Sequence, residues 1–138
     1  MSVNHRSHTT CLAALTVAAM LSFVPASHAQ TGAAESGVRD ALQRYSAALE
    51  SLDANAVKKV QPSIPADNLA KAFKDMRELK VKIDEVRVLS LDGSTARVSC
   101  KVTQTLTPKA GSRQTTAVTR VMRLRRATDM WVIDGFER

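Results

Sequence analysis

The spacing of apolar residues predicts that the first part of the globular chain is helical. From residue 35 to residue 52, apolar side chains recur every three or four positions, which is the period of one helix face. Charged residues such as Arg39 and Arg44 fall outside this stripe, so the helix is amphipathic and buries one side. The stripe consists of Val38, Leu42, Tyr45, Leu49 and Leu52.

Two shorter helices are predicted next. Asp53 is a good N-cap for the first of them, and the nearby prolines Pro62 and Pro65 end it. Asp67 is expected to cap the second. The inward faces of these two helices comprise Val57 and Val60, then Leu69, Phe73 and Met76.

From Leu79 onward the apolar period changes to two, which is typical of β-strands. The alternation resumes out of phase at Val86, and this shift predicts a β-bulge near residues 84–85. Asp92 followed by Gly93 predicts a hairpin turn. The strand after that turn buries Ala96, Val98, Cys100 and Val102.

Two further strands complete the pattern. The strand over residues 113–126 is expected to present Val118, Arg120, Met122 and Leu124 on one side. The last strand, residues 130–137, is apolar on both sides, so we expect it at the centre of the sheet or at a partner interface. Three helices leading into a four-stranded antiparallel meander predict a single domain of the α+β class.

The N-terminus has the features of a secretory signal peptide. An apolar run of 13 residues, 12–24, is followed by Pro25 and the small-residue site Ser27-His28-Ala29. The run is shorter than the roughly 20 residues that a membrane-spanning helix needs. We therefore expect residues 1–29 to be a signal peptide cleaved near Ala29, and residues 30–138 to form a periplasmic or secreted domain.

Export would remove every histidine from the chain and leave carboxylates, Tyr45, lysine, arginine, serine and threonine to carry any chemistry. His5, His8 and His28 are the only histidines, and all of them lie in the predicted signal peptide. Cys100 is the one cysteine outside it, so no intramolecular disulfide is expected. Histidine-based triads and His or multi-Cys metal sites are therefore excluded from the exported domain, and we predict no cofactor and no metal site.

Several phrases resemble the nuclear transport factor 2-like (NTF2-like) superfamily, which includes SnoaL-like and ketosteroid isomerase-like proteins. They are Arg44-Tyr45 on the first helix, "SLDANAVKKV", "VTRVMRL" and "MWVIDGFE", in that order. The resemblance implies a cone in which three N-terminal helices pack inside a curved four-stranded antiparallel sheet, leaving an apolar pocket. It also implies a homodimer through the outer sheet face. The superfamily includes isomerases, dehydratases, cyclases and members without activity, so the fold alone does not define function.

Comparison with the ketosteroid isomerases tests the catalytic alternative. Their helix-one tyrosine matches Tyr45, but their oxyanion aspartate lies in a phrase like "VTRVMRL", where this sequence has Arg120. Their base lies in an additional segment between the second and third helices, and residues 61–67 are too short to contain it. The resemblance therefore argues against isomerase chemistry.

Four residues are predicted to line a ligand pocket, and a purely structural role is considered beside the ligand-binding one. Tyr45 contributes either a core ring or a hydroxyl that contacts a ligand. Arg120 either extends to solvent at the pocket mouth or binds a carboxylate or phosphate. Gln104 continues the apolar face of its strand and could share that role, and Trp131 is either core or a stacking surface for a ligand.

The positive charge is concentrated in the second half of the chain. Residues 30–92 hold ten basic and ten acidic side chains, whereas residues 93–138 hold nine basic and three acidic ones. Arg97, Lys101, Arg123 and Arg125 are expected on the outer sheet face. Such a patch suits an anionic envelope surface, while export and the lack of interleaved aromatic residues argue against nucleic acid.

These observations favour an exported, non-catalytic protein that binds a small apolar or anionic molecule in its cone. Two alternatives stay open at this point. One is an enzyme of the isomerase, dehydratase or cyclase type that uses Tyr45 with an unidentified carboxylate. The other is an interaction module that acts through the basic outer sheet face.

Overall fold

A computed structural model describes the backbone of residues 27–138 and the side chains of residues 31–138. The apolar run of the predicted signal peptide lies outside the described residues. Three helices precede a four-stranded antiparallel sheet, so the expected α+β class is confirmed. The elements are α1 (Ser27–Glu50), α2 (Ala54–Val60), α3 (Ala66–Lys74), β1 (Met76–Leu91), β2 (Thr95–Pro108), β3 (Gln114–Ala127) and β4 (Met130–Phe136).

The long helix α1 buries the predicted stripe. Val38, Leu42, Tyr45 and Leu49 are all less than 8% exposed. The helix begins earlier than the predicted residue 35 and ends at Glu50. Leu52 adopts a left-handed backbone conformation (φ 53°), which turns the chain away from the helix axis.

The start of α2 agrees with its predicted cap, whereas that of α3 does not. The Asp53 carboxylate accepts a hydrogen bond of 2.9 Å from the backbone N–H of Asn55. The N-cap of α3 is Pro65, whose carbonyl accepts the first helical bond from the N–H of Leu69, so the predicted capping role of Asp67 was wrong. Asp67 lies in the first turn instead, where its negative charge still favours the helix dipole.

The sheet contains the predicted irregularities. The register of β1 against β2 shifts between Asp84 and Arg87, and Glu85 has a φ of 51°, which confirms the bulge. The β1–β2 turn is held by Asp92, whose carboxylate accepts bonds of 2.7 Å from the N–H groups of Ser94 and Thr95.

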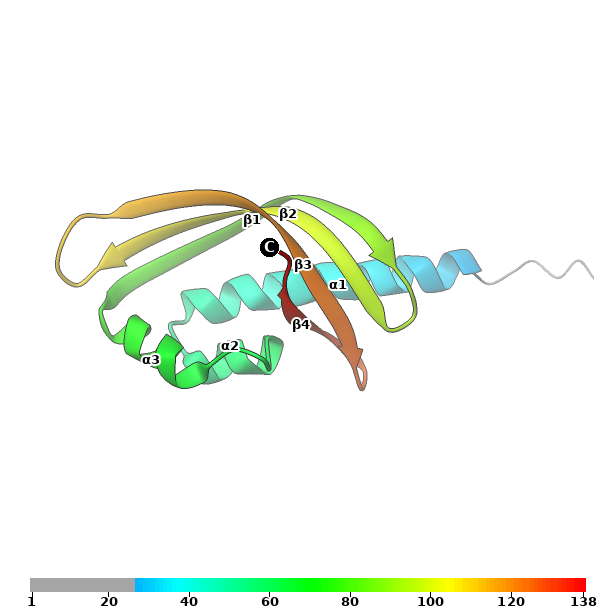
Figure 1. Cartoon of the computed structure of the whole chain (residues 1–138), viewed down its shortest axis with the longest axis horizontal. Helices are drawn as coiled ribbons and strands as arrows, with labels where there is room; N and C mark the ends of the chain where they lie inside the picture. The colour runs from blue at the N-terminus through cyan, green and yellow to red at the C-terminus, as the bar shows by residue number, and fades with distance from the viewer. Residues whose placement is uncertain (1–26) are drawn as a thin grey trace, which may run out of the picture.

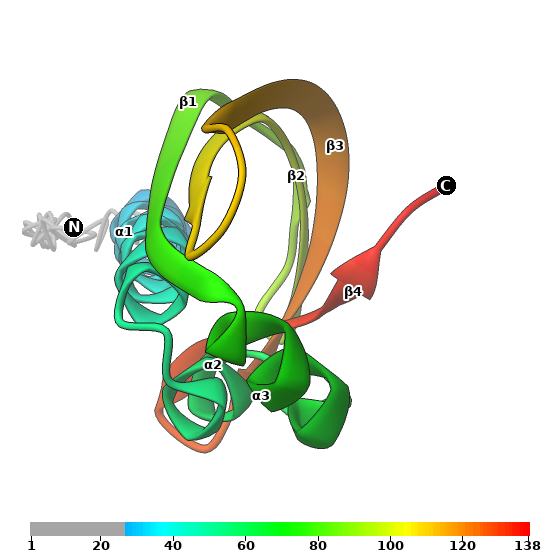
Figure 2. The ribbon, with the colours of Figure 1, turned by 90° about the vertical axis from the view of Figure 1, so that its left-hand side faces the viewer.

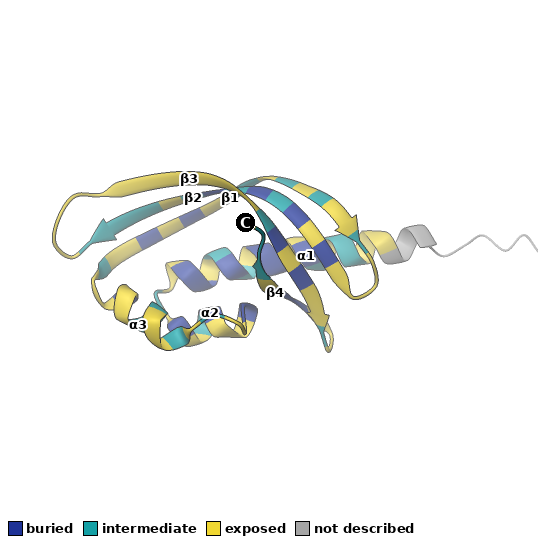
Figure 3. Cartoon of the chain, in the orientation of Figure 1, coloured by how far each residue is buried: buried dark blue, intermediate teal, exposed yellow. Residues whose placement is uncertain are grey.

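The sheet curves around α1, while α2 and α3 lie below it (Figures 1 and 2). The core lies between the concave sheet face and α1, where buried and exposed positions alternate along the strands (Figure 3). The predicted inner face of β2 is confirmed, because Ala96, Val98, Cys100 and Val102 are all buried. The largest side chains with almost no exposure are Met122, Leu124, Ile133, Val38, Val57 and Val98.

The last strand occupies an edge of the sheet, so of the two expected positions for β4 the central one was wrong. The strand order is β1-β2-β3-β4, although Trp131, Val132 and Ile133 are all buried as their composition suggested. The apolar character of β4 is explained by α1, which packs against this edge.

Side chains of α1 bond to the backbone at both sheet edges. The Arg44 guanidinium donates a 3.0 Å hydrogen bond to the carbonyl of Trp131 on β4. At the opposite edge, the Glu50 carboxylate accepts a 2.8 Å bond from the N–H of Val81 on β1. The helix therefore joins the two edges and closes the open sheet.

The contact between α1 and the Trp131 side chain of β4 is predicted to require glycine at position 37. A Cβ at Gly37 would lie 2.7 Å from Cδ1 of the buried Trp131 indole. We expect Gly37→Ala to lower the free energy of unfolding by about 1–3 kcal/mol, because the indole cannot move without disturbing the core. Gly32→Ala is the matched control on the same helix, since a Cβ there meets nothing within 4 Å.

Urea unfolding of both variants checks this prediction. A helix-propensity effect alone would stabilise each by up to about 1 kcal/mol. Stabilisation of Gly37→Ala to the same degree as Gly32→Ala would contradict the steric argument.

Candidate functional site

The candidate site is a cavity of about 120 Å³ on the concave side of the sheet. It lies where β2 and β3 meet the end of β4 and the middle of α1. Its lining combines apolar side chains with four polar ones, and no carboxylate is among them. The lining residues are Tyr45, Val102, Gln104, Thr116, Val118, Arg120, Met122 and Phe136.

Tyr45 presents its hydroxyl to this cavity from a buried ring. The residue is 7% exposed, and its ring packs at a tilt against Phe136 with 6.3 Å between centroids. Its hydroxyl has no hydrogen-bond partner within residues 31–138. Burial raises the pKa of the Tyr45 phenol above its usual value of 10, and the positive charge of Arg120 partly offsets this effect.

Arg120 reaches the same cavity from the middle of β3. Its guanidinium carbon lies 5.5 Å from the centroid of the Phe136 ring, which is a cation–π contact. It forms no ion pair with any carboxylate of the described chain, in contrast to Arg97 and Arg125 on the opposite sheet face. Its charge is therefore available to a ligand at the cavity.

Gln104 and Thr116 form the outer part of the cavity wall. They are direct partners in the β2–β3 register. They lie next to the pair Val102 and Val118 on the same sheet face, on the side toward the β2–β3 loop. Their amide and hydroxyl groups are exposed at the mouth of the cavity. The structure thus brings three of the four predicted ligand residues, Tyr45, Gln104 and Arg120, to one cavity.

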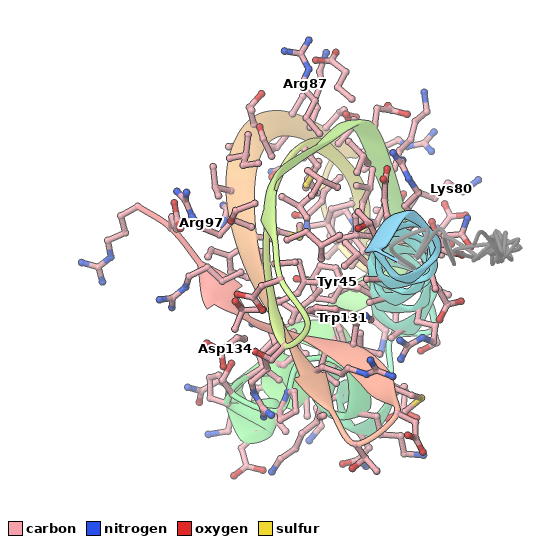
Figure 4. The ribbon with its side chains drawn as sticks, turned by 90° about the vertical axis from the view of Figure 1, so that its right-hand side faces the viewer. Tyr45, Lys80, Arg87, Arg97, Trp131 and Asp134 are labelled. Carbon is pink, nitrogen blue, oxygen red and sulfur yellow. The ribbon has the colours of Figure 1, made fainter. Side chains whose placement is uncertain are left out.

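The fourth predicted ligand residue, Trp131, lies elsewhere. It is 4% exposed, packs against Gly37, and lines a separate depression of about 370 Å³ together with Arg126 and Asp129. Figure 4 shows Tyr45 and Trp131 at different heights between α1 and the sheet. Trp131 therefore does not share the cavity of Tyr45 and Arg120.

Phe136 is the central site residue that the sequence pattern did not reveal. Simple alternation from Ile133 would turn Gly135 inward and Phe136 outward. The β3–β4 register shifts between Arg123 and Leu124, so Phe136 instead faces Met122 on the inner side. A single unpaired residue in β4 thus brings an aromatic ring between Tyr45 and Arg120.

Most of the predicted basic residues on the outer sheet face have carboxylate partners. Arg97 binds Glu137 through two hydrogen bonds of 2.6 and 2.7 Å, and these lower the pKa of the Glu137 carboxyl. Lys101 pairs with Glu85, and Arg125 with Asp134. Asp134 lies on the surface, and Figure 4 shows Arg97 extending away from the sheet. This pairing reduces the positive charge that the outer face offers to an anionic partner.

Other reactive features are absent from the described region. Cys100 is fully buried, and burial raises the pKa of its thiol, so it is a poor nucleophile. Within residues 31–138, no three His, Cys, Asp or Glu side chains are placed to share a metal ion. None of the helices in this region has the length and apolar character needed to cross a membrane.

The Tyr45 environment predicts an abnormal alkaline titration. Tyr45 is the one tyrosine in the sequence, so absorbance near 295 nm reports its ionisation directly. We expect a midpoint above 10 in the folded protein and a further increase in Arg120→Met, because that variant loses the charge that favours the phenolate. A folded midpoint equal to that of the urea-unfolded chain would contradict the buried, Arg120-facing placement.

Comparison with known proteins identifies the fold. No protein-family model matches the chain, and no curated protein matches it in sequence. Several solved structures have similar folds. A proposed dehydratase of the NTF2-like family from Streptomyces avermitilis is 16% identical, with a TM-score of 0.65 over 77% of this chain and 95% of that one.

The second is a proposed scytalone dehydratase from Novosphingobium aromaticivorans. It is 9% identical, with a TM-score of 0.69 over 80% of this chain and 85% of that one. The third is a hexachlorocyclohexane dehydrochlorinase, which is 10% identical, with a TM-score of 0.65 over 79% of this chain and 86% of that one. These likenesses confirm the expected architecture: the chain has the NTF2-like fold.

Proposed function

We propose that this NTF2-like domain binds a small anionic molecule with an apolar portion, and that it does so without catalysis. The observation that carries the proposal is the meeting of two polar groups at one cavity, neither of them paired with another group of the described chain. These are the Tyr45 hydroxyl, which has no partner in the described chain, and the Arg120 guanidinium, which has no carboxylate there.

The donor chemistry of the cavity suits a carboxylate. Arg120 offers a planar fork of N–H groups that matches the two oxygens of a carboxylate. The Tyr45 hydroxyl, the Gln104 amide and the Thr116 hydroxyl add further donors around the same space. Because no acid lines the cavity, an anionic group meets donors without facing a like charge.

The apolar part of the lining and the cavity size restrict the ligand. Val102, Val118, Met122 and Phe136 supply an apolar wall. The cavity of about 120 Å³ is small and has room for a small molecule only. A single ring or a short aliphatic chain bearing one carboxylate fits this space, and anything larger would extend through the mouth.

The same lining favours binding over the enzymatic alternative. The solved structures of this fold include proteins named as dehydratases and a dehydrochlorinase, but at 9–16% identity they support the fold alone. Proton transfer of the isomerase type needs a base within hydrogen-bond reach of the substrate. Neither a carboxylate nor an imidazole lines the Tyr45 cavity, and this supports a binding role.

Binding of benzoate, compared with benzyl alcohol, tests the proposal. We expect calorimetry to detect benzoate but not the alcohol at similar concentration, because the alcohol lacks the charge that Arg120 recognises. Arg120→Met should weaken benzoate binding by about 10-fold or more, since a hydrogen bond to a charged group contributes about 1.5–3 kcal/mol.

Arg123→Met is the matched control. Arg123 lies on the same strand but on the outer face, so its replacement removes one positive charge without touching the cavity. It should leave the benzoate affinity within about twofold of the wild type. Equal binding of benzoate and benzyl alcohol, or equal affinity in both variants, would refute the proposed role of the cavity cation.

Export is part of the proposal and has its own test. If the predicted signal peptide directs secretion, the exported protein begins at Gln30. N-terminal sequencing of the protein recovered from the periplasm or medium checks this. Retention of the intact 138-residue chain inside the cell would contradict it.

A further inference from the structure

The first half of β3 is an unpaired sheet edge. β4 pairs with β3 only over residues 122–127, so the stretch from Gln114 to Arg120 has β2 on one side and no described strand on the other. Figure 1 shows this part of β3 extending with β2 beyond the helices. Every residue from 114 to 120 is exposed (Figure 3). Among them is an apolar residue, Val118, which is 39% exposed.

This edge differs from the two that α1 covers. β1 has its edge N–H at Val81 bound by Glu50, and it carries a bulge and exposed lysines such as Lys80 and Lys82. β4 has its edge carbonyl at Trp131 bound by Arg44. Occupied backbone groups, a bulge and exposed lysines all hinder the pairing of another strand with these edges. The stretch 114–120, "QTTAVTR", has no proline, lysine or acid, and its register with β2 is regular.

The hydrogen-bonding direction of each residue on this edge follows from one contact. The carbonyl of Val121 accepts a 2.9 Å bond from the N–H of Glu137, so the backbone of Val121 points away from β2. In an antiparallel strand, alternate residues point their backbone groups to the same side. Thr119, Ala117 and Thr115 therefore direct both N–H and C=O outward, and none of these groups has a partner in residues 31–138.

We propose that a second copy of this chain pairs with this edge, β3 against β3, antiparallel about a twofold axis at Ala117. In this register Ala117 faces the partner's Ala117, and Thr115 faces the partner's Thr119. Each of these positions forms a hydrogen-bonded pair that exchanges two bonds, so every outward N–H and C=O of the stretch is satisfied in both copies. The strand is thus complementary to itself.

Side chains and charges fit the same register. On the outer face, threonines lie opposite threonines, which is a favourable cross-strand pair. On the inner face, Val118 lies opposite the partner's Thr116, and Arg120 opposite the partner's Gln114. No cation faces a cation, although the chain carries a net charge of +7.

The pairing would also extend the ligand cavity. Thr116, Val118 and Arg120 line the cavity and belong to the paired stretch. The partner's Gln114 and Thr116 would therefore stand beside the cavity mouth and add polar groups to it. A second copy is favoured over an unrelated peptide because the side chains of this stretch complement themselves in the same register, with threonine opposite threonine and Arg120 opposite the partner's Gln114.

Sedimentation velocity of the full chain and two variants tests the inference. The wild type should shift from monomer to dimer as its concentration increases, since an interface of this size is weak. Ala117→Pro should remain monomeric, because proline removes an outward N–H while leaving the bonds to β2 intact. Ala117→Val is the matched control and should dimerise like the wild type, since its backbone groups are unchanged.

Amide hydrogen exchange of the wild type is a second test, and it does not require the proline variant to fold. It also distinguishes the β3 edge from the outer sheet face as the dimer interface. The amides of Thr115, Ala117 and Thr119 in the wild type should exchange about tenfold more slowly at high than at low protein concentration. The exchange rates of the Thr116 and Val118 amides, which point to β2, should not depend on protein concentration.

Ala117→Lys is a third variant. It would place two lysines opposite each other across the proposed interface and should also prevent dimerisation.

Three outcomes would overturn the inference. One is a wild type that stays monomeric at all concentrations. Another is a dimer that persists in folded Ala117→Pro, which would indicate the outer sheet face or another surface. The third is protection of the outward amides that does not depend on protein concentration. None of these outcomes depends on benzoate binding, so the proposed function is judged separately.

Discussion

The contact of α1 with both edges of the sheet is the interaction on which the rest of the molecule depends. The two outermost strands, β1 and β4, carry backbone groups that no strand pairs, and α1 supplies a side chain to one such group on each: Glu50 to the N–H of Val81, and Arg44 to the carbonyl of Trp131. These bonds tie the helix to an outer strand on each side of the sheet. Between them the concave face packs against α1, and burial of its apolar side chains provides most of the favourable free energy of folding.

The cavity lies at the point where α1 and β4 stop covering β2 and β3. Arg44 is held against β4, and the next residue, Tyr45, faces inward beneath the strand end at Phe136. Beyond that point β2 and β3 continue without a helix or a fourth strand beside them. The cavity therefore forms at the boundary between the closed and the open part of the sheet, where one polar ring and one free guanidinium meet apolar walls. The same boundary leaves the β3 edge exposed.

Much of the fold could be predicted from the sequence because its signals are local. The Leu42–Tyr45–Leu49 stripe, the phase change near residues 84–85 and the alternation in β2 each express which side of an element is buried. The capping of α3 and the edge position of β4 could not be predicted in this way. Pro65 replaces Asp67 as the cap, and β4 is apolar on both faces because a helix packs on the edge strand. For the site, Tyr45, Gln104 and Arg120 follow from strand and helix faces, whereas Phe136 depends on a register shift that only pairing with β3 reveals.

The burial of Cys100 limits how two copies of the protein can be joined. In an oxidising compartment an exposed lone thiol would become linked to a second molecule. The Cys100 sulfur is buried in the core on the concave face of the sheet, and the raised pKa of its thiol keeps it protonated. Self-association of the folded domain therefore does not proceed through a disulfide at Cys100.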